Sequence, residues 1–172
     1  MEPTPPQLAQ VVTQLLSAAW PNDENERREW FDRFQITPTI ALDGFRRWGR
    51  GIPGWGDTTT CWGMSQEGFT GVSWFLWEGL TEEDRAHARN QLEAEFHERF
   101  GQPSLRAVPG HAGWMEWVRG DIVIELCHAD AAPRRVQLHV IHQTRTVEPE
   151  NIDADRQDAP SVNGTATASI RV

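Results

Sequence analysis

The sequence predicts an α+β domain in which helices cover one face of an antiparallel sheet. Segments with apolar residues every three or four positions, typical of helices, occur near the N-terminus and over residues 82–100. Between and after them lie short runs rich in Val, Ile, Thr, Phe and Trp, separated by turn sequences, which is typical of antiparallel strands. The predicted order is α-α-β-β-β-α-β-β-β, a two-layer arrangement with the helices packed on one side.

Two helices are expected at the N-terminus. Thr4 and the two prolines after it suit a helix start, because a hydroxyl can cap the first amides and proline lacks only an N–H that would be unpaired there. An apolar stripe at helical spacing follows, and Pro21 ends it. Asn22 or Asp23 can cap a shorter second helix with three aromatic residues on one side. These are Trp30, Phe31 and Phe34.

The first three strands are expected in the next forty or so residues. Residues 36–43 alternate in the manner of an edge strand that tolerates Pro38. The stretch 44–56, rich in Gly, Arg and Trp, is interpreted as a long connection. Residues 58–62 and 69–77 are strand-like and are predicted to pair as a hairpin.

A third helix and three further strands complete the predicted order. Thr81 can cap the helix, an apolar stripe at i, i+4 spacing runs to Phe100, and Gly101 ends it. The last three strands alternate apolar and polar positions and are joined by short turns. They are predicted over 113–119, 121–128 and 134–142.

The length of 172 residues suits one domain, predicted over residues 1–145, with residues 146–172 as an acidic C-terminal tail. The tail has no aromatic residue and ends in small and polar ones, so we expect it to be flexible.

The net charge of −9 comes from 25 acidic residues against 16 basic ones, all of them Arg. An acidic protein repels phosphate backbones, which disfavours nucleic acid as a partner and favours a basic protein. Acidity that serves only solubility is the alternative. No stretch approaches the roughly 20 apolar residues of a membrane span, and the N-terminus does not resemble an export signal. We therefore expect a cytoplasmic protein that binds no membrane.

Catalytic, cofactor and metal sites are not predicted. Cys61 and Cys127 form no CxxC pair and are interpreted as two buried, unreactive thiols. His139 and His142 lie three apart on a strand and should therefore face opposite sides, where they cannot share a metal. His128 could approach one of them together with Cys127, but no metal-binding spacing supports such a site.

The predicted sheet carries apolar residues on both faces, because in strand 69–77 Val72 and Trp74 point one way while Phe69 and Phe75 point the other. Three helices can cover only one face, so the second is expected to bind a partner. Coverage by the glycine-rich connection, the helix pair or a second copy, in a homodimer, is the alternative.

Arginines interleave with aromatic residues in the glycine-rich connection, a mixture that suits single-stranded nucleic acid or a protein hot spot. The acidity of the chain favours the protein; stacking of arginines on tryptophans within the fold is the alternative. The candidate partner-binding residues from this connection and from the sheet are Arg46, Arg47, Trp48, Trp55, Trp62, Trp74 and Trp117.

Three short motifs carry a resemblance: WFDRF near residue 30, the segment 67–74, and the helix exit 99–103 followed by a strand from Trp114. Over roughly residues 8–142 they resemble small uncharacterised actinobacterial proteins encoded near secreted polymorphic toxins. The resemblance implies an immunity role, in which a cytoplasmic protein blocks a sister cell's toxin. The element order is also similar, in topology alone, to that of chaperones of secreted effectors.

The sequence thus predicts a non-catalytic protein-binding domain, foremost an immunity protein that neutralises a cognate secreted toxin by direct binding. One alternative is a cytoplasmic chaperone of a secreted effector. The other is an enzyme of unknown type, which would need a clustered acid, base or metal.

Overall fold

The structure, a computed structural model, contains three α-helices and seven strands in the residues that it describes. The described residues are 2–36, 46–50, 55, 58–105, 111–129 and 135–145, with the backbone alone at 46–50, 59, 111, 112 and 129. The helices are α1 (Pro5–Ser17), α2 (Glu24–Arg33), α3 (Glu82–Phe100) and the short 3₁₀ helix η1 (Gln143–Arg145). The strands are β1 (Arg46–Arg50), β2 (Thr59–Ser65), β3 (Gly68–Leu76), β4 (Ser104–Leu105), β5 (His111–Arg119), β6 (Ile122–Ala129) and β7 (Val136–His142).

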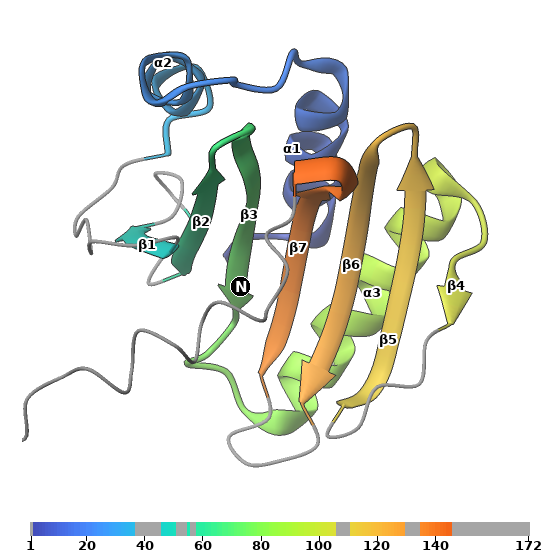
Figure 1. The fold of residues 1–172 in the computed structure, drawn as a ribbon. Coiled ribbons are helices and arrows are strands. Elements are labelled where there is room, and N and C mark those ends of the chain that lie inside the picture. Colours follow the sequence, from blue (N-terminus) through green and yellow to red (C-terminus); the bar gives the residue numbers. More distant parts are fainter. Residues whose placement is uncertain are drawn as a thin grey trace, which may run out of the picture.

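All strands belong to one antiparallel sheet in the order β1-β2-β3-β7-β6-β5-β4. The chain leaves the sheet after β3, crosses behind it in α3, and returns so that β7 pairs with β3. In Figure 1, α1 and α3 lie behind the sheet and α2 lies beyond the ends of β2 and β3. The α+β class and the element order predicted from the sequence are confirmed.

The helix boundaries follow from their end residues as predicted. The side chain of Asp23, rather than Asn22, caps α2 by accepting hydrogen bonds from the amides of residues 25 and 26. Thr81 caps α3 by accepting from the amide of Asp84 at 3.2 Å. The α3 helix ends at Gly101, whose φ of 74° favours glycine.

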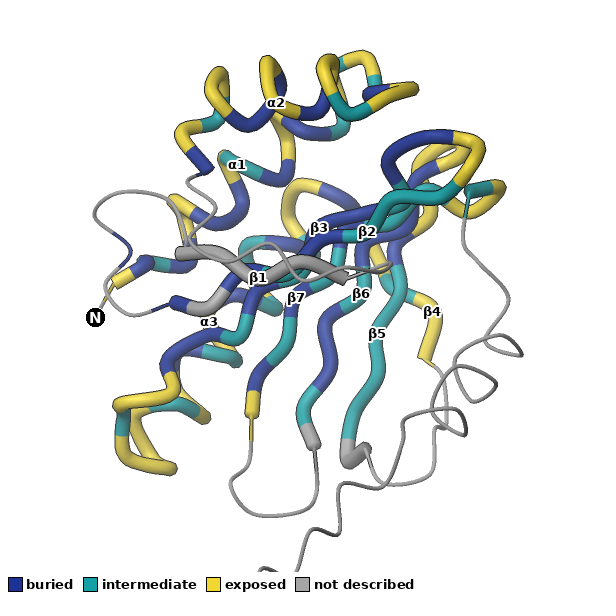
Figure 2. Tube along the Cα trace, turned by 60° about the vertical axis from the view of Figure 1, so that its left-hand side comes forward, coloured by how far each residue is buried: buried dark blue, intermediate teal, exposed yellow. Residues whose placement is uncertain are grey.

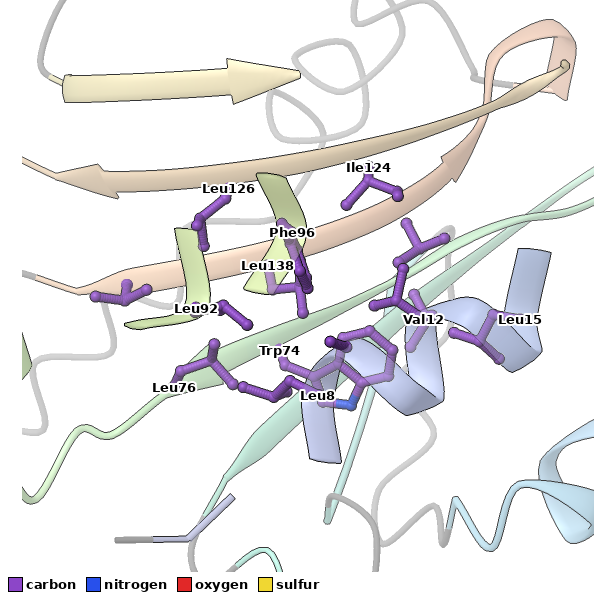
Figure 3. Close-up of a cluster of buried hydrophobic side chains, with 14 of the residues drawn as sticks. Leu8, Val12, Leu15, Trp74, Leu76, Leu92, Phe96, Ile124, Leu126 and Leu138 are labelled. Atoms are coloured by element: carbon purple, nitrogen blue, oxygen red, sulfur yellow. The ribbon is translucent and has the colours of Figure 1, made fainter. Parts of the chain in front are cut away.

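The face of the sheet toward α1 and α3, called the inner face below, forms the core (Figure 3). From the helices come four residues of α1 and four of α3 with almost no exposed surface. From the sheet come the alternate residues of five strands. The inner-face residues are Thr60, Trp62, Val72, Trp74, Leu76, Trp117, Ile124, Leu126, Val136, Leu138 and Val140. Burial of this much apolar area is the main source of stability.

A β-bulge at Thr70 turns Phe69 toward the helices. The register between β2 and β3 shifts by one residue there, which reverses the direction of the side chains beyond it. Phe69 is fully buried, with its ring centroid 5.3 Å from that of Trp20 and 5.1 Å from that of Trp30. Its predicted place on the same side as Phe75 is therefore wrong.

Arg145 joins the connection between α1 and α2 to the end of the sheet. Its guanidinium donates to the carbonyl oxygen of Pro21 at 2.5 Å and to Oδ1 of Asn22 at 2.7 Å. The same Pro21 oxygen accepts from the amide of Phe69 in β3. These hydrogen bonds join the segment before α2 to the start of β3 and to η1.

The structure corrects the predicted elements in three places. The stretch 44–56 is not wholly a connection, because residues 46–50 form β1 at the edge of the sheet. The two-residue strand β4 and the 3₁₀ helix η1 were not predicted. The strand expected over 36–43 lies outside the described residues except for its first residue, Ile36, which is buried, and the tail 146–172 lies outside them too.

Candidate protein-binding face

The face of the sheet opposite α1 and α3, called the outer face below, has no α-helix over it in the part of the chain that the structure describes (Figure 1). Strand register aligns its side chains in rows across β3, β7, β6 and β5. Its residues are Ser73, Phe75, Trp114, Glu116, Val118, Val123, Glu125, Cys127, Gln137, His139 and Ile141. Most of them are half-buried, and β5 is intermediate along most of its length in Figure 2.

The outer face differs from the apolar surface that the sequence predicts, because its middle row is polar. That row runs Ser73, His139, Glu125, Glu116 across four strands. Apolar residues predominate in the rows on either side. One row holds Val118, Val123 and Ile141, and the other holds Phe75, Cys127 and Trp114 together with Gln137. The prediction of two apolar faces is therefore wrong for the middle of the sheet.

His139 is the centre of a hydrogen-bonded cluster. Its Nδ1 lies 2.6 Å from Oγ of Ser73, and its Nε2 lies 3.2 Å from Oε1 of Gln137 and 3.7 Å from Sγ of Cys127. The indole of Trp114 is parallel to the imidazole, with an angle of 5° and 6.4 Å between ring centroids. The cluster holds the imidazole against the sheet surface.

Cys127 is unsuited to nucleophilic chemistry, although it contacts a histidine. Burial, with a smaller contribution from the negative charge of Glu125, raises the pKa of its thiol to about 12. The thiolate is the reactive species, so at neutral pH the thiol is almost wholly protonated. Cys127 is buried as expected from the sequence, whereas Cys61, which was also expected to be buried, is only half-buried.

The contact between Ser73 and His139 is half of a nucleophile–base arrangement, yet its backbone surroundings do not suit acyl transfer. Ser73 lies in the interior of the sheet, paired with Cys61 of β2 on one side and with His139 of β7 on the other. The amides of such strands are used in the ladder, whereas an oxyanion hole needs N–H groups directed at the reacting oxygen. Among the described residues, the arrangement fixes the imidazole of His139 on the sheet surface.

Two of the histidines considered from sequence lie on the inner side. His142 faces Trp20, with ring centroids 5.6 Å apart, so it and His139 point to opposite faces as predicted. His128 contacts Arg89 of α3 at 3.2 Å instead of approaching His139. Among the described residues, no three His, Cys, Asp or Glu side chains are grouped to hold a metal ion.

Four of the seven predicted partner-binding residues are core residues, which corrects the prediction. Trp74 and Trp117 belong to the inner face, and Trp62 does too, beside Phe31 of α2. Trp55 is also buried, with its ring centroid 5.8 Å from that of Trp74. Burying the large apolar surface of these side chains in the core is more favourable than leaving it exposed to water.

The remaining three predicted residues, Arg46, Arg47 and Trp48, belong to β1 at the edge of the sheet. The backbone register pairs Trp48 with Cys61, which is itself opposite Ser73. Their side chains lie outside the described part of the chain.

Sequence reasoning missed the polar row of the outer face. The signal was present as polar residues within apolar strand sequences, with Glu116, Glu125 and His139 in three different strands. Only the register shows that these positions are neighbours, and the register depends on β7 pairing with both β3 and β6.

Comparison with known proteins found no matching family model, no similar curated protein and no similar solved structure. Within the described chain, no helix combines the length and the apolar character needed to cross a membrane.

Proposed function

We propose that this chain is a non-catalytic protein-binding domain that neutralises a secreted bacterial toxin by binding it directly. The observation that carries the proposal is the outer face. It combines aromatic, aliphatic and polar side chains, most of them half-buried, over four adjacent strands. Mixed composition with aromatic anchors is typical of the centre of a protein–protein interface.

The arrangement of the outer face favours binding over catalysis. Its histidine is fixed by Ser73 and Gln137, and its thiol is held protonated by burial. A rigid surface in which side chains are already ordered loses little entropy on association. The resemblance of the sequence to proteins encoded beside polymorphic toxins supports a toxin as the partner.

The experiment is co-expression with the protein encoded by the adjacent gene. The proposal expects that this neighbour arrests growth when expressed alone, that growth is restored when this chain is co-expressed, and that the two proteins co-purify in a defined ratio. Growth arrest that persists despite a stably folded protein would contradict the proposal. Binding only to the unfolded N-terminal segment of an exported protein would instead support the chaperone alternative.

A further inference from the structure

The α2 helix has fewer buried apolar side chains than the other two α-helices. Five residues of α1 and four of α3 are buried, and all of them are apolar. Three residues of α2 are buried, and one of these is the charged Arg27, beside Trp30 and Phe31. A segment with few buried apolar contacts opens at a lower free-energy cost than the rest of a fold.

Arg27 is 4% exposed, and its guanidinium is only partly paired. Its Nε and Nη2 donate to the two carboxylate oxygens of Glu24 at 2.8 Å and 2.7 Å. Its Nη1 is buried and has no hydrogen-bond partner among the described residues. The guanidinium carbon lies instead 4.5 Å from the ring centroid of Phe31 and 5.5 Å from that of Trp62. Because a buried N–H without an acceptor costs free energy that hydration removes, Arg27 favours a position of α2 away from the sheet.

Three indole N–H groups at the same end of the sheet are also unpaired. Those of Trp20, Trp30 and Trp62 are buried and have no acceptor within the described part of the chain. The ring centroid of Trp30 lies 5.9 Å from that of Trp20, and the centroid of Trp62 lies 5.0 Å from that of Phe31 in α2. By contrast, the indole of Trp117 donates to a backbone oxygen at the end of α3 at 2.8 Å. The packed position of α2 therefore combines aromatic contacts with four unpaired buried donors.

The segment before α2 is fixed to the sheet by hydrogen bonds. The carbonyl oxygen of Pro21 accepts from the amide of Phe69 at 3.0 Å and from the guanidinium of Arg145 at 2.5 Å. A Cβ atom added at Gly68 would lie 2.8 Å from the same oxygen, which shows how closely the segment approaches β3. This anchor ends before the N-cap residue Asp23, so a movement of α2 can pivot there.

We propose that α2 is a hinged lid over the aromatic residues at this end of the sheet, and that it opens while α1 and α3 stay packed. Opening hydrates the guanidinium of Arg27 and the unpaired indoles, and it uncovers Trp62 of β2 and Phe69 of β3. A helix of 10 residues is marginal on its own in water, so the amides of α2 lose their hydrogen bonds in the open state. The lid is independent of the proposed function, since its opening needs no partner.

The first measurement is amide hydrogen exchange of the full chain, read by mass spectrometry. The amides of α2 are expected to exchange roughly tenfold faster than the interior amides of α1 and α3, because local opening precedes global unfolding. Exchange of all three helices at one common rate would show that α2 does not open separately.

The second measurement compares two tryptophans that are equally buried when the lid is closed. Trp62 is 2% exposed and Trp117 is 1% exposed, and both lie on the inner face. Hydroxyl-radical labelling should oxidise Trp62 several times faster, because only Trp62 lies beneath α2. Equal labelling of the two residues would contradict the lid.

The Arg27→Met variant tests the cause of opening. Methionine keeps a long side chain over the aromatic rings but has no N–H, and Glu24 retains its contact with Arg28 at 3.4 Å. Since replacing a buried charge with an apolar side chain is often neutral or stabilising where the partner charge stays compensated, exchange of α2 should slow by roughly threefold. Faster exchange in this variant would show that Arg27 holds α2 closed, and would overturn the proposed cause.

The matched control is Arg85→Met in α3. The guanidinium of Arg85 donates to the backbone oxygens of Trp77 and Leu80 at 3.2 Å and 2.6 Å. Its removal breaks hydrogen bonds that are made, so exchange in the first turn of α3 should become faster, opposite to the effect of Arg27→Met on α2. Parent exchange and labelling test the lid even if a variant fails to fold. The co-expression experiment tests the proposed function separately.

Discussion

The two faces of the sheet are built from alternate residues of the same strands, yet they have different compositions. On β7, Leu138 is fully buried beneath the helices while its neighbour His139 is half-buried on the outer side. The inner face is almost wholly apolar, and the outer face has a polar row between two mainly apolar ones. One residue along a strand thus separates a position in the core from one on the proposed binding face.

The difference shows why aromatic content alone is a poor guide to a binding surface. Trp62, Trp74 and Trp117 have the size and polarity of hot-spot residues, but all are in the core. Large aromatic side chains are favourable both in a core and at a protein interface. Whether a given tryptophan belongs to one or the other therefore depends on which face of the sheet the helices cover. The residues of the proposed binding face are less apolar than those predicted from the sequence to bind a partner.

The largest expected effect distinguishes neighbouring positions of β7. Leu138→Ala should lower the free energy of unfolding by about 2–5 kcal/mol, because it leaves a cavity among tightly packed inner-face side chains. Urea unfolding followed by tryptophan fluorescence measures this. A loss below about 1 kcal/mol would show that the inner face is not the closely packed side.

A smaller effect is expected where β3 and β7 approach closely. A Cβ atom added at Gly71 would lie 2.8 Å from the backbone oxygen of Val140, so the two strands would have to separate. Gly71→Ala should therefore destabilise the protein by about 1–3 kcal/mol, as overpacking does elsewhere. The urea midpoint reports the change. The matched control is Gly79→Ala, where nothing lies within 4 Å of the added atom.

On the outer face, His139→Ala should cost only about 0.5–1.5 kcal/mol, the usual net value of the hydrogen bond that it shares with Ser73. Its effect is best compared with that of Leu138→Ala in the same unfolding assay. Equal losses for the two neighbours would remove the distinction between the faces.

The smallest effect concerns pH and the inner-side histidine His142. Burial, followed by the charge of Arg145, lowers the pKa of His142 from its usual 6.5, and Asp121 opposes this shift. The folded state then binds the proton more weakly than the unfolded state. The contribution of His142 to the stability of the fold is complete above the pKa that this residue has in the unfolded chain. It is lost as the pH falls from there through the lower pKa of the folded state.

When the pH is lowered from about 7.5 to about 5, the free energy of unfolding should therefore fall less in the His142→Gln variant than in the parent protein. Urea midpoints at several pH values in this range test the difference. Parallel pH profiles for the two proteins would show that His142 does not contribute.

The elements with strong local signals could be predicted from the sequence. The helix caps at Asp23, Thr81 and Gly101 act within a few residues, so the helices were placed correctly. The three long strands β5, β6 and β7 were also predicted, because turns bound their alternating patterns. Local chemistry is sufficient for both.

The features that depend on distant partners could not be predicted. The strand β1 is rich in Arg and Gly and is defined by its pairing with β2, not by strand propensity. The bulge at Thr70 reverses the alternation that sequence reasoning assumes. The outer-face row requires the non-sequential pairing of β3 with β7, which the pattern of neither strand specifies.

The most direct test of the account is the binding of the Val118→Arg variant to the product of the adjacent gene, because Val118 is 48% exposed on the outer face. We expect the complex of this variant to dissociate several times faster than that of the parent protein, while a Glu83→Gln/Glu98→Gln variant on the exposed side of α3 behaves like the parent. Unchanged dissociation for Val118→Arg, with weaker binding only for the α3 variant, would contradict the assignment of the outer face as the binding surface.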